Sequence, residues 1–209
     1  MKTNDLYPIF LKLDQVQTLI VGAGNVGLVK VNFILRQSPN AKIKIVGDTF
    51  HPEIISKALN NKSIQIVERK FISQDLDKVK VLIVATKNEK LNTEIYHLAQ
   101  SRNILTNVVD NPPLCDFYTA AVMKKGPVKI AVSSNGASPT LAKRLRDILE
   151  EVIPDEVEYT AEILEQIRTL LKGDLQEKIK TLNALTTVLS PKYNCNEKIV
   201  GREFLRRLT

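Results

Sequence analysis

The sequence predicts an α/β fold built around a parallel β-sheet. Short apolar runs alternate with segments of helical periodicity over roughly the first half of the chain, and this alternation is typical of parallel strands joined by crossover helices. A glycine-rich turn separates the first apolar run from the first helical segment, as expected where a buried strand turns sharply into a helix. The pattern then changes, which indicates a second region of different architecture.

The predicted strands are apolar and rich in β-branched residues. They cover residues 18–22, 42–47, 63–69, 80–86 and 104–110. Helical spacing of apolar residues follows the first strand from Val26 onward, and further helices are expected over 51–61 and 88–103. Asn88 stands where the last of these helices begins and is its expected N-cap.

The region after the last of these strands predicts a β-hairpin rather than another β-α-β unit. Residues 117–124 and 128–134 have strand character, and Lys125, Gly126 and Pro127 form the short turn between them. Parallel strands need a much longer crossover, so we expect this pair to be antiparallel.

The rest of the chain is expected to be helical. Ser138 is a natural N-cap with Pro139 at the first helical position, so a helix begins there. Asp174 and Glu177 resemble a capping box at the start of a later helix. Two apolar stripes at helical spacing consist of Val157, Ala161, Leu164, Ile167 and Leu171, and of Leu175, Ile179, Leu182 and Leu189.

These patterns divide the chain into three parts. An α/β domain spans residues 1–113, the strand pair and a linking helix span 114–150, and a helical domain spans 151–209. No apolar run reaches the roughly 18 residues that a membrane helix needs. The N-terminus also has no signal-peptide pattern, so we expect a cytoplasmic protein without membrane contact.

Cysteine and histidine are both rare. Cys115 and Cys195 are far apart and outside any C-x-x-C spacing, which argues against a disulfide framework or a zinc site and fits a reducing cytosol. The histidines are His51 and His97, so a metal site built from imidazoles is not expected either.

The chain is basic, with 30 lysines and arginines against 23 acidic residues and a net charge of +7. This excess is either ordinary solubility charge or a sign of an acidic partner. A nucleic acid is not expected, because aromatic residues make up 5% of the chain and no basic run is interleaved with them. A small polyanionic substrate fits the charge at least as well.

Gly22, Gly24 and Gly27 form a G-x-G-x-x-G motif between the first strand and the first helix. In dinucleotide-binding folds the first glycine permits the tight turn, the second lets the backbone approach the pyrophosphate, and the third lets the helix pack closely on the strand. The helix N-terminus then presents free N–H groups and a partial positive charge to the phosphates. The motif therefore predicts a Rossmann-like sheet that binds a dinucleotide.

Asp48 ends the second predicted strand, where a carboxylate can bind the ribose hydroxyls of the adenosine half. It would repel the 2′-phosphate of NADP, so the expected cofactor is NAD. The alternative is that Asp48 is a turn residue or the N-cap of the helix that begins at His51.

Polar residues that end later strands are further site candidates, because open parallel sheets bind ligands at the carboxyl ends of their strands. Thr86 and Asn107 either line the nicotinamide half of the site or simply end their strands. Asp110 closes its strand, where a carboxylate can take a proton while a hydride passes to the cofactor. Alternatively, Asp110 caps the turn into Asn111 and the prolines that follow.

The loop and helix start at 131–146 could grip a carboxylated ligand. Two serines and Asn-Gly end the strand, Ser-Pro begins the helix, and its first turns carry Lys143, Arg144 and Arg146. The alternative is an ordinary turn followed by a solvated basic helix face.

Taken together, these segments resemble the precorrin-2 dehydrogenase/sirohydrochlorin ferrochelatase family, which also forms the N-terminal module of fused siroheme synthases. The matching segments are YPIFLKL, LIVGAGNVGLVK, the VAT of the fourth strand, NVVDNP, FYTAA and AVSSNGASPTLAKRLR, in order across roughly residues 1–150. The resemblance implies a Rossmann domain, a dimerisation segment with strands from both subunits, and a small helical domain. It also implies oxidation of precorrin-2 to sirohydrochlorin with NAD.

The resemblance assigns roles to particular residues. Asp110 matches the catalytic aspartate of the family, and Ser134 matches a serine beside the tetrapyrrole pocket. The positions that match cofactor contacts are Asn25, Val26, Asp48 and Thr49. The substrate carries eight carboxylate arms, which would give the net charge and the basic cluster of 143–146 an acidic partner.

Two other functions remain as alternatives. Some members of the family also insert iron into sirohydrochlorin, and a chelatase could need only a carboxylate such as Asp110, since the macrocycle supplies four nitrogens. A dinucleotide-sensing module would share the fold and the ribose acid. Such a module would not need the SSNGASP loop or a carboxylate after the fifth strand.

Overall fold

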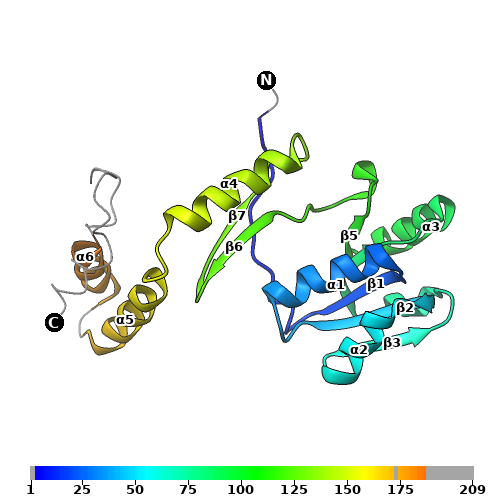
Figure 1. The fold of residues 1–209 in the computed structure, drawn as a ribbon, viewed down its shortest axis with the longest axis horizontal. Helices are drawn as coiled ribbons and strands as arrows, with labels where there is room; N and C mark the ends of the chain where they lie inside the picture. The colour runs from blue at the N-terminus through cyan, green and yellow to red at the C-terminus, as the bar shows by residue number, and fades with distance from the viewer. Residues whose placement is uncertain (1–2, 172–173, 187–209) are drawn as a thin grey trace. The chain divides into compact units, whose positions relative to one another are not determined.

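The structure of the protein is a computed structural model that describes residues 3–171 and 174–186 (Figure 1). It divides into two compact units, the first from Met1 to Thr119 and the second from Ala120 to Thr209. Each unit has its own helices and strands. Within the described residues, no helix combines the length and apolar character needed to cross a membrane.

The first unit is built on a five-stranded parallel sheet with the order β3-β2-β1-β4-β5. Its strands are β1 (Gln17–Ala23), β2 (Lys42–Phe50), β3 (Ile64–Glu68), β4 (Val79–Val84) and β5 (Leu105–Val108). The order changes direction at β1, so the chain crosses to the other half of the sheet after β3. Such a switch point forms the crevice that receives ligands in open α/β sheets.

Helices cover both faces of this sheet. They are α1 (Asn25–Gln37), α2 (Pro52–Asn60) and α3 (Glu89–Gln100), with the short 3-10 helices η1 (Ser73–Leu76) and η2 (Pro112–Leu114). Alternate residues of β1 point to opposite faces, so Ile20 packs in the cluster that contains α1 and α2 residues. Leu19 instead packs in the cluster that contains η1 and α3 residues. Both side chains are fully buried.

The predicted Rossmann-like α/β fold is confirmed, with differences at the ends of elements. β2 continues to Phe50 instead of ending before Asp48, and β5 ends at Val108 because Val109 and Asp110 already form a turn. The segment that becomes η1 was not predicted. It is too short to show helical periodicity, and tertiary contacts hold it in place.

The second unit contains a β-hairpin and helices. Its elements are β6 (Ala121–Lys125), β7 (Val128–Val132), α4 (Pro139–Val152), α5 (Val157–Leu170) and α6 (Leu175–Leu185). The predicted antiparallel pair is confirmed, and its turn consists of Gly126 and Pro127 because Lys125 still pairs with Val128. The first strand begins at Ala121, four residues later than predicted, whereas Phe117 packs against the core of the first unit.

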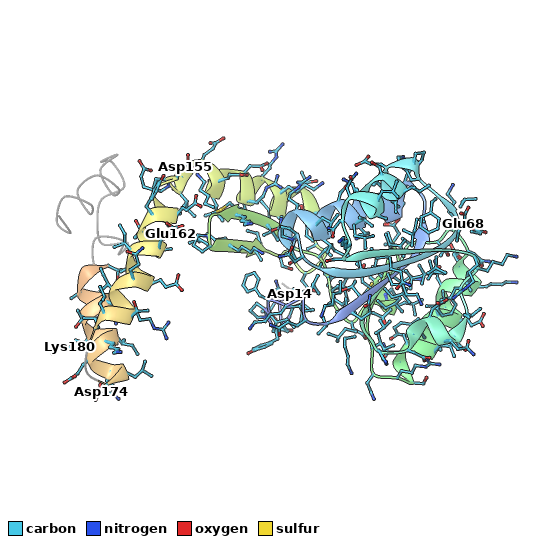
Figure 2. All side chains as sticks on the ribbon, turned by 90° about the horizontal axis from the view of Figure 1, so that it is seen from below. Asp14, Glu68, Asp155, Glu162, Asp174 and Lys180 are labelled. Carbon is cyan, nitrogen blue, oxygen red and sulfur yellow. The ribbon has the colours of Figure 1, made fainter. Side chains whose placement is uncertain are left out.

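Polar contacts fix the helices of the second unit. Lys125 donates from Nζ to the Ile153 carbonyl at 2.6 Å and pairs with Asp155 at 2.7 Å, so the strand end holds the end of α4. Asp174 caps α6 as predicted, accepting a hydrogen bond from the backbone N–H of Glu177 at 2.9 Å; Asp155 and Asp174 are labelled in Figure 2. Leu189, the last member of the predicted second stripe, lies outside the described residues.

Candidate dinucleotide-binding site

A cleft of about 980 Å³ opens at the carboxyl ends of β1, β2 and β4, wholly within the first unit. It lies at the switch point of the sheet order, where an open α/β sheet is expected to bind its ligand. Predicted site residues that line it are Gly22, Gly24, Asn25, Val26, Asp48, Thr49 and Thr86. The ends of three strands that are far apart in sequence thus meet in one crevice.

The three glycines of the motif meet different spatial demands. Gly22 has a φ of +105°, and a β-carbon there would lie 2.5 Å from the Ala85 carbonyl oxygen. A β-carbon on Gly27 would lie 2.1 Å from the Gly22 carbonyl oxygen, so Gly27 is needed for the close packing of α1 on β1. A β-carbon on Gly24 would meet nothing within 4 Å and would fill part of the cleft instead.

The N-terminus of α1 faces this cleft without a competing anion. Gly24 is the N-cap and provides no side-chain hydrogen bond, and the first turn contains no acidic residue. The first backbone N–H groups of the helix are therefore available, and the helix dipole favours negative charge beside them. Asn25 and Val26 line the cleft on this first turn. The residues present fit a dinucleotide pyrophosphate.

Asp48 is exposed within β2 and lines the cleft together with Thr49. The alternative that Asp48 caps the following helix is wrong. The N-cap of α2 is His51, whose Nδ1 accepts a hydrogen bond from the backbone N–H of Glu53 at 3.2 Å. The Asp48 carboxylate is consequently available to a ligand at the end of its strand.

Thr86 lines the cleft after β4 and is held by a residue that the sequence did not single out. Its hydroxyl donates a hydrogen bond to Oδ1 of Asn92, whose Nδ2 donates to the Thr86 carbonyl at 3.1 Å. Asn92 is buried in α3. Asn88 is the N-cap of this helix, as predicted, and its Oδ1 accepts a hydrogen bond from the N–H of Leu91. A polar residue on the apolar face of the predicted helix was the available signal for Asn92.

The end of β3 contributes two further cleft residues that were missed. Lys70 and Phe71 follow this strand and line the cleft. The rule that selected Thr86 and Asp110, a side chain placed just after a parallel strand, also applies to these two positions.

Asp110 lies after β5 and does not line the cleft. It is exposed, with a left-handed φ of +58°, a conformation that Asp tolerates better than most residues. Among the described residues its carboxylate has no hydrogen-bond partner, so it does not cap the turn that leads to η2. Its role as a catalytic base therefore stays a prediction.

Asn107 is a buried residue of β5. Its Nδ2 donates to the Phe117 carbonyl at 2.9 Å and approaches Sγ of Cys115 at 3.4 Å, so the amide holds the segment that leaves η2. Oδ1 has no partner among the described residues. The contact with substrate that the sequence predicts for Asn107 stays a prediction. The hydrogen bonds of Asn107 within the protein use only Nδ2 and leave Oδ1 without an assigned role.

Lys30 is a half-buried cation on α1, and its charge interacts with that of Asp110, which follows β5. Burial lowers its pKa below the ordinary value, while the negative charge of Asp110 opposes that change. The thiol of Cys115 is half-buried too, and burial raises its pKa. Cys115 is a free cysteine, and the described residues contain no group of three metal-ligating side chains.

The remaining predicted residues belong to the second unit. Ser134 accepts a hydrogen bond at Oγ from the N–H of Ser138, so it orders the loop before α4. Lys143 and Arg144 are exposed on the first turns of this helix. Arg146 instead forms an ion pair with its neighbour Asp147, which occupies part of its guanidinium.

Fold, glycine turn and cleft together define a dinucleotide-binding domain, and family comparison agrees. A model of the family described as "Putative NAD(P)-binding" matches residues 9–121, more than half of the chain. The chain therefore belongs to this family of NAD(P)-binding domains. A second model, described as "Sirohaem biosynthesis protein central", matches residues 125–151.

Curated proteins that are similar to this chain include siroheme synthases. The siroheme synthase of Pseudoalteromonas atlantica is 36% identical over 167 residues, which cover 80% of this chain and 36% of that protein. Siroheme synthase 1 of Serratia proteamaculans is 36% identical over 171 residues, covering 82% of this chain and 35% of that protein. The chain thus spans about a third of the length of these relatives.

A solved structure named SirC, precorrin-2 dehydrogenase, has the same fold. It superposes with a TM-score of 0.72 at 23% identity and covers 97% of this chain and 98% of its own. The likeness extends over nearly the whole length of both chains. These matches confirm the resemblance drawn from the sequence motifs.

Proposed function

We propose that this chain is an NAD-dependent dehydrogenase that oxidises the reduced tetrapyrrole precorrin-2 to sirohydrochlorin. The observation that carries the proposal is the order of the two family matches. An NAD(P)-binding domain at 9–121 is followed directly by a sirohaem biosynthesis segment at 125–151 on the same chain. A redox cofactor and a tetrapyrrole-related segment in succession favour oxidation of the tetrapyrrole.

The cofactor part of the proposal rests on the cleft. The open space at Gly24 and the uncapped N-terminus of α1 suit the pyrophosphate, and the Asp48 carboxylate suits the hydroxyls of the adenosine ribose. A 2′-phosphate beside Asp48 would suffer repulsion between like charges, so NAD is favoured over NADP. When bound, NAD supplies the acceptor for the hydride that leaves the substrate.

Asp110 is the proposed general base. Oxidation removes a hydride and a proton from the substrate, and the proton passes to a carboxylate oxygen of Asp110 and then to water. Its exposure and its lack of a hydrogen-bond partner among the described residues leave both oxygens able to accept that proton. The positive charge of Lys30 interacts with the negative charge of Asp110.

Basic residues of the second unit are proposed to hold substrate carboxylates. Lys143 and Arg144 are exposed near the N-terminus of α4, and the Ser134 loop precedes it. Arg146 is the weaker candidate because Asp147 already pairs with it. Two exposed cations at a helix N-terminus provide charge-assisted donors for carboxylate arms.

A homodimer is part of the proposal. On α4 the side chains of Leu141, Leu145, Ile148 and Val152 are 52%, 42%, 54% and 70% exposed. Their spacing of four, three and four residues makes one apolar stripe, and a self-complementary stripe suits a two-fold contact with a second copy. Sedimentation should show a dimer for the wild type and a monomer for Ile148→Glu, whereas a wild-type monomer at micromolar concentration would refute the contact.

An anaerobic assay with precorrin-2 and NAD tests the function as a whole. We expect loss of precorrin-2 absorbance with stoichiometric NADH formation. Tight NAD binding without turnover would identify a dinucleotide-sensing module instead. Adding ferrous iron after the oxidation is complete tests the chelatase alternative separately, because siroheme would then form without further NADH.

A cytoplasmic location is also part of the proposal, and it fits the free thiol of Cys115. Fractionating cells that express the full chain checks it.

A further inference from the structure

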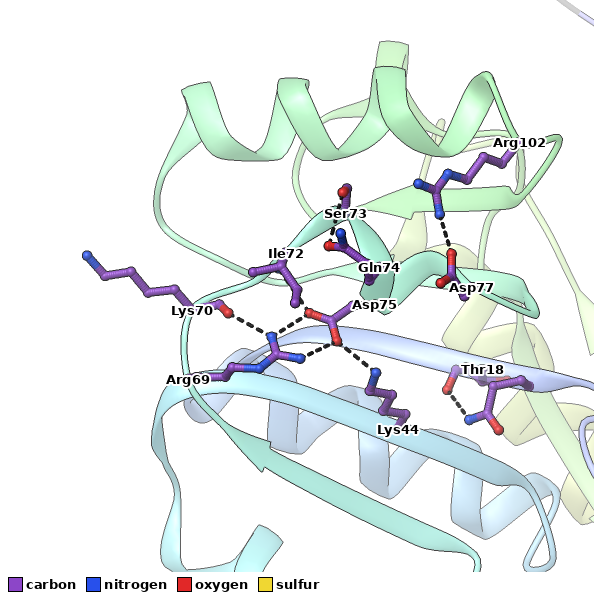
Figure 3. Close-up of polar contacts among 11 residues, drawn as sticks. Thr18, Lys44, Arg69, Lys70, Ile72, Ser73, Gln74, Asp75, Asp77 and Arg102 are labelled. Atoms are coloured by element: carbon purple, nitrogen blue, oxygen red, sulfur yellow. Dashed lines mark hydrogen bonds and ion pairs between the residues drawn. The ribbon is translucent and has the colours of Figure 1, made fainter.

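A buried carboxylate lies next to the cleft without lining it. Asp75 of η1 is 1% exposed. Arg69 donates to it through Nη1 at 2.7 Å and Nη2 at 2.8 Å, Lys44 donates through Nζ at 2.7 Å, and the backbone N–H of Ile72 donates at 3.0 Å (Figure 3). We call these four residues the Asp75 cluster.

The balance of charges holds the side chains of the Asp75 cluster in one fixed arrangement. Burial by itself raises the pKa of Asp75, but the hydrogen bonds from Arg69 and Lys44 and the N–H of Ile72 outweigh it, so the net pKa lies well below its ordinary value. The carboxylate is therefore charged throughout the physiological range. A bidentate guanidinium and an ammonium on one buried anion fix its position in both distance and direction.

The cluster joins three elements that are distant in sequence. Lys44 lies near the start of β2, Arg69 follows β3, and Asp75 belongs to η1; Figure 3 shows the contacts between them. Arg69 also donates from Nη1 to the Lys70 carbonyl at 2.9 Å. One guanidinium thus holds both the buried carboxylate and the backbone of the segment between β3 and η1.

That segment forms a wall of the cleft. Lys70 and Phe71 lie between Arg69 and Ile72, both of which the cluster holds, and both residues line the cleft. β3 is the neighbour of β2, and Glu68 pairs with Gly47, one residue before Asp48. Lys70 and Phe71 therefore leave the sheet beside the strand that carries the ribose acid, which marks the adenosine half of a dinucleotide site.

We propose that Asp75 is a positioning residue for the adenosine half of the cofactor. Its cluster holds the Lys70–Phe71 wall in the conformation that receives adenosine, so that these side chains need not be ordered when the ligand binds. Phe71, half-buried against the core of the first unit, is the apolar residue of this wall and would contact the base, while the exposed Lys70 adds a cation to it. This inference rests on the dinucleotide part of the proposed function and is independent of the tetrapyrrole.

Arg69→Met tests the inference in the full chain. This variant keeps an apolar side chain of similar length and leaves the Asp75 carboxylate paired with Lys44 and the Ile72 N–H. We expect the affinities for NAD and for AMP to fall by a similar factor of about tenfold, since ordering the two side chains now opposes binding. Affinity for nicotinamide mononucleotide should stay unchanged. In turnover, KM for NAD should rise while kcat stays the same.

Arg102→Met is the matched control. It removes the exposed ion pair between Arg102 and Asp77 at 2.8 Å, which lies at the other end of η1 and outside the Asp75 cluster. Its NAD and AMP affinities should equal those of the wild type. Should Arg69→Met not fold, Phe71→Ser with the cluster intact should show the same selective loss of NAD and AMP affinity.

The outcomes separate this inference from the proposed function. A folded Arg69→Met protein with wild-type affinity for NAD and AMP overturns the inference alone. Equal losses for AMP and nicotinamide mononucleotide also overturn it, because the effect would then not be confined to the adenosine half. A wild-type chain that binds neither NAD nor AMP would overturn the proposed cofactor as well, whereas a chain that binds NAD without oxidising precorrin-2 leaves this inference standing.

Discussion

The carbonyl oxygen of Gly22 occupies the space that a side chain at position 27 would need. A β-carbon built on Gly27 lies 2.1 Å from that oxygen, much closer than any unstrained contact. The first and third glycines of the motif are therefore coupled through space: the turn at Gly22 and the close approach of α1 are one structural feature. Gly24 between them is free of this constraint and faces the cleft.

Gly27→Ala should damage the fold and the site together. The added methyl group forces α1 away from β1, and overpacking of this kind costs about 1–3 kcal/mol in the free energy of unfolding. Urea unfolding and NAD titration should both register the change. Val29→Ala, on the exposed side of the same helix, is the control and should leave both measurements close to wild type.

Gly24→Val should separate binding from stability. Gly24 has an extended backbone with a φ of −82°, which valine adopts readily, and nothing lies within 4 Å of its β-carbon position. The melting temperature should change little, while NAD affinity falls about tenfold or more as hydrogen bonds to the pyrophosphate are blocked. If NAD bound Gly24→Val as well as wild type, the pyrophosphate would have to lie elsewhere.

Asp48→Ala should change the choice between NAD and NADP. Losing hydrogen bonds from ribose hydroxyls to a carboxylate should weaken NAD about tenfold, while NADP loses a repulsive contact. The ratio of the two dissociation constants is the measurement. Glu68→Ala is the control, because it removes an acid from the end of the neighbouring strand, outside the cleft lining, and should leave the ratio unchanged. An unchanged ratio in Asp48→Ala would show that Asp48 does not bind the ribose.

Asp110→Asn should abolish most turnover and spare cofactor affinity. Asparagine also tolerates the left-handed backbone at this position, so the change removes the base without straining the turn. Turnover should fall by about 10²–10⁴, the usual contribution of a general base. Asp77→Asn, an exposed acid that precedes β4, serves as control, and a near-wild-type rate in Asp110→Asn would rule out the proposed base.

The stability of the first unit should depend on pH through Asp75. Its pKa in the folded state lies well below the ordinary 3.8, so the unfolded chain binds the proton first as the pH falls. The stabilisation is present in full above about pH 5 and is lost progressively as the pH falls through 3.8 and below. Thermal melts over this range should show a steep acid decline in the wild type.

Asp75→Asn provides the comparison for this decline. It leaves Arg69 and Lys44 without their anion, so unfolding at neutral pH should become easier by about 3 kcal/mol. Because the titrating group is gone, the acid decline should also be shallower than in the wild type. Parallel declines in both proteins would show that other carboxylates govern acid unfolding.

Much of the site was predictable because it is encoded locally. The glycine motif, Asp48, Thr86 and Asn88 each follow a recognisable strand or begin a recognisable helix, and the structure places them at the carboxyl edge of one sheet. Lys70 and Phe71 could have been found by the same rule. They directly follow the strand predicted over 63–69, which the structure ends at Glu68.

Other features depend on partners that sequence order does not reveal. Asp75 reads as an ordinary polar residue in a short loop, yet it is buried because Lys44, 31 positions earlier, reaches it across the sheet. Asn107 reads as the polar end of a strand, but its amide is committed to the Phe117 carbonyl.

The sequence by itself determined the kinds and order of the elements, the parallel sheet and the glycine turn, since hydrophobic periodicity and glycine spacing act over a few neighbouring residues. Only the tertiary structure decided which polar groups are held by partners distant in sequence. A buried carboxylate such as Asp75 exists only where donors from separate strands converge to offset its desolvation. Asp48 and Asp110 have no such donors among the described residues and are exposed at the edge of the sheet.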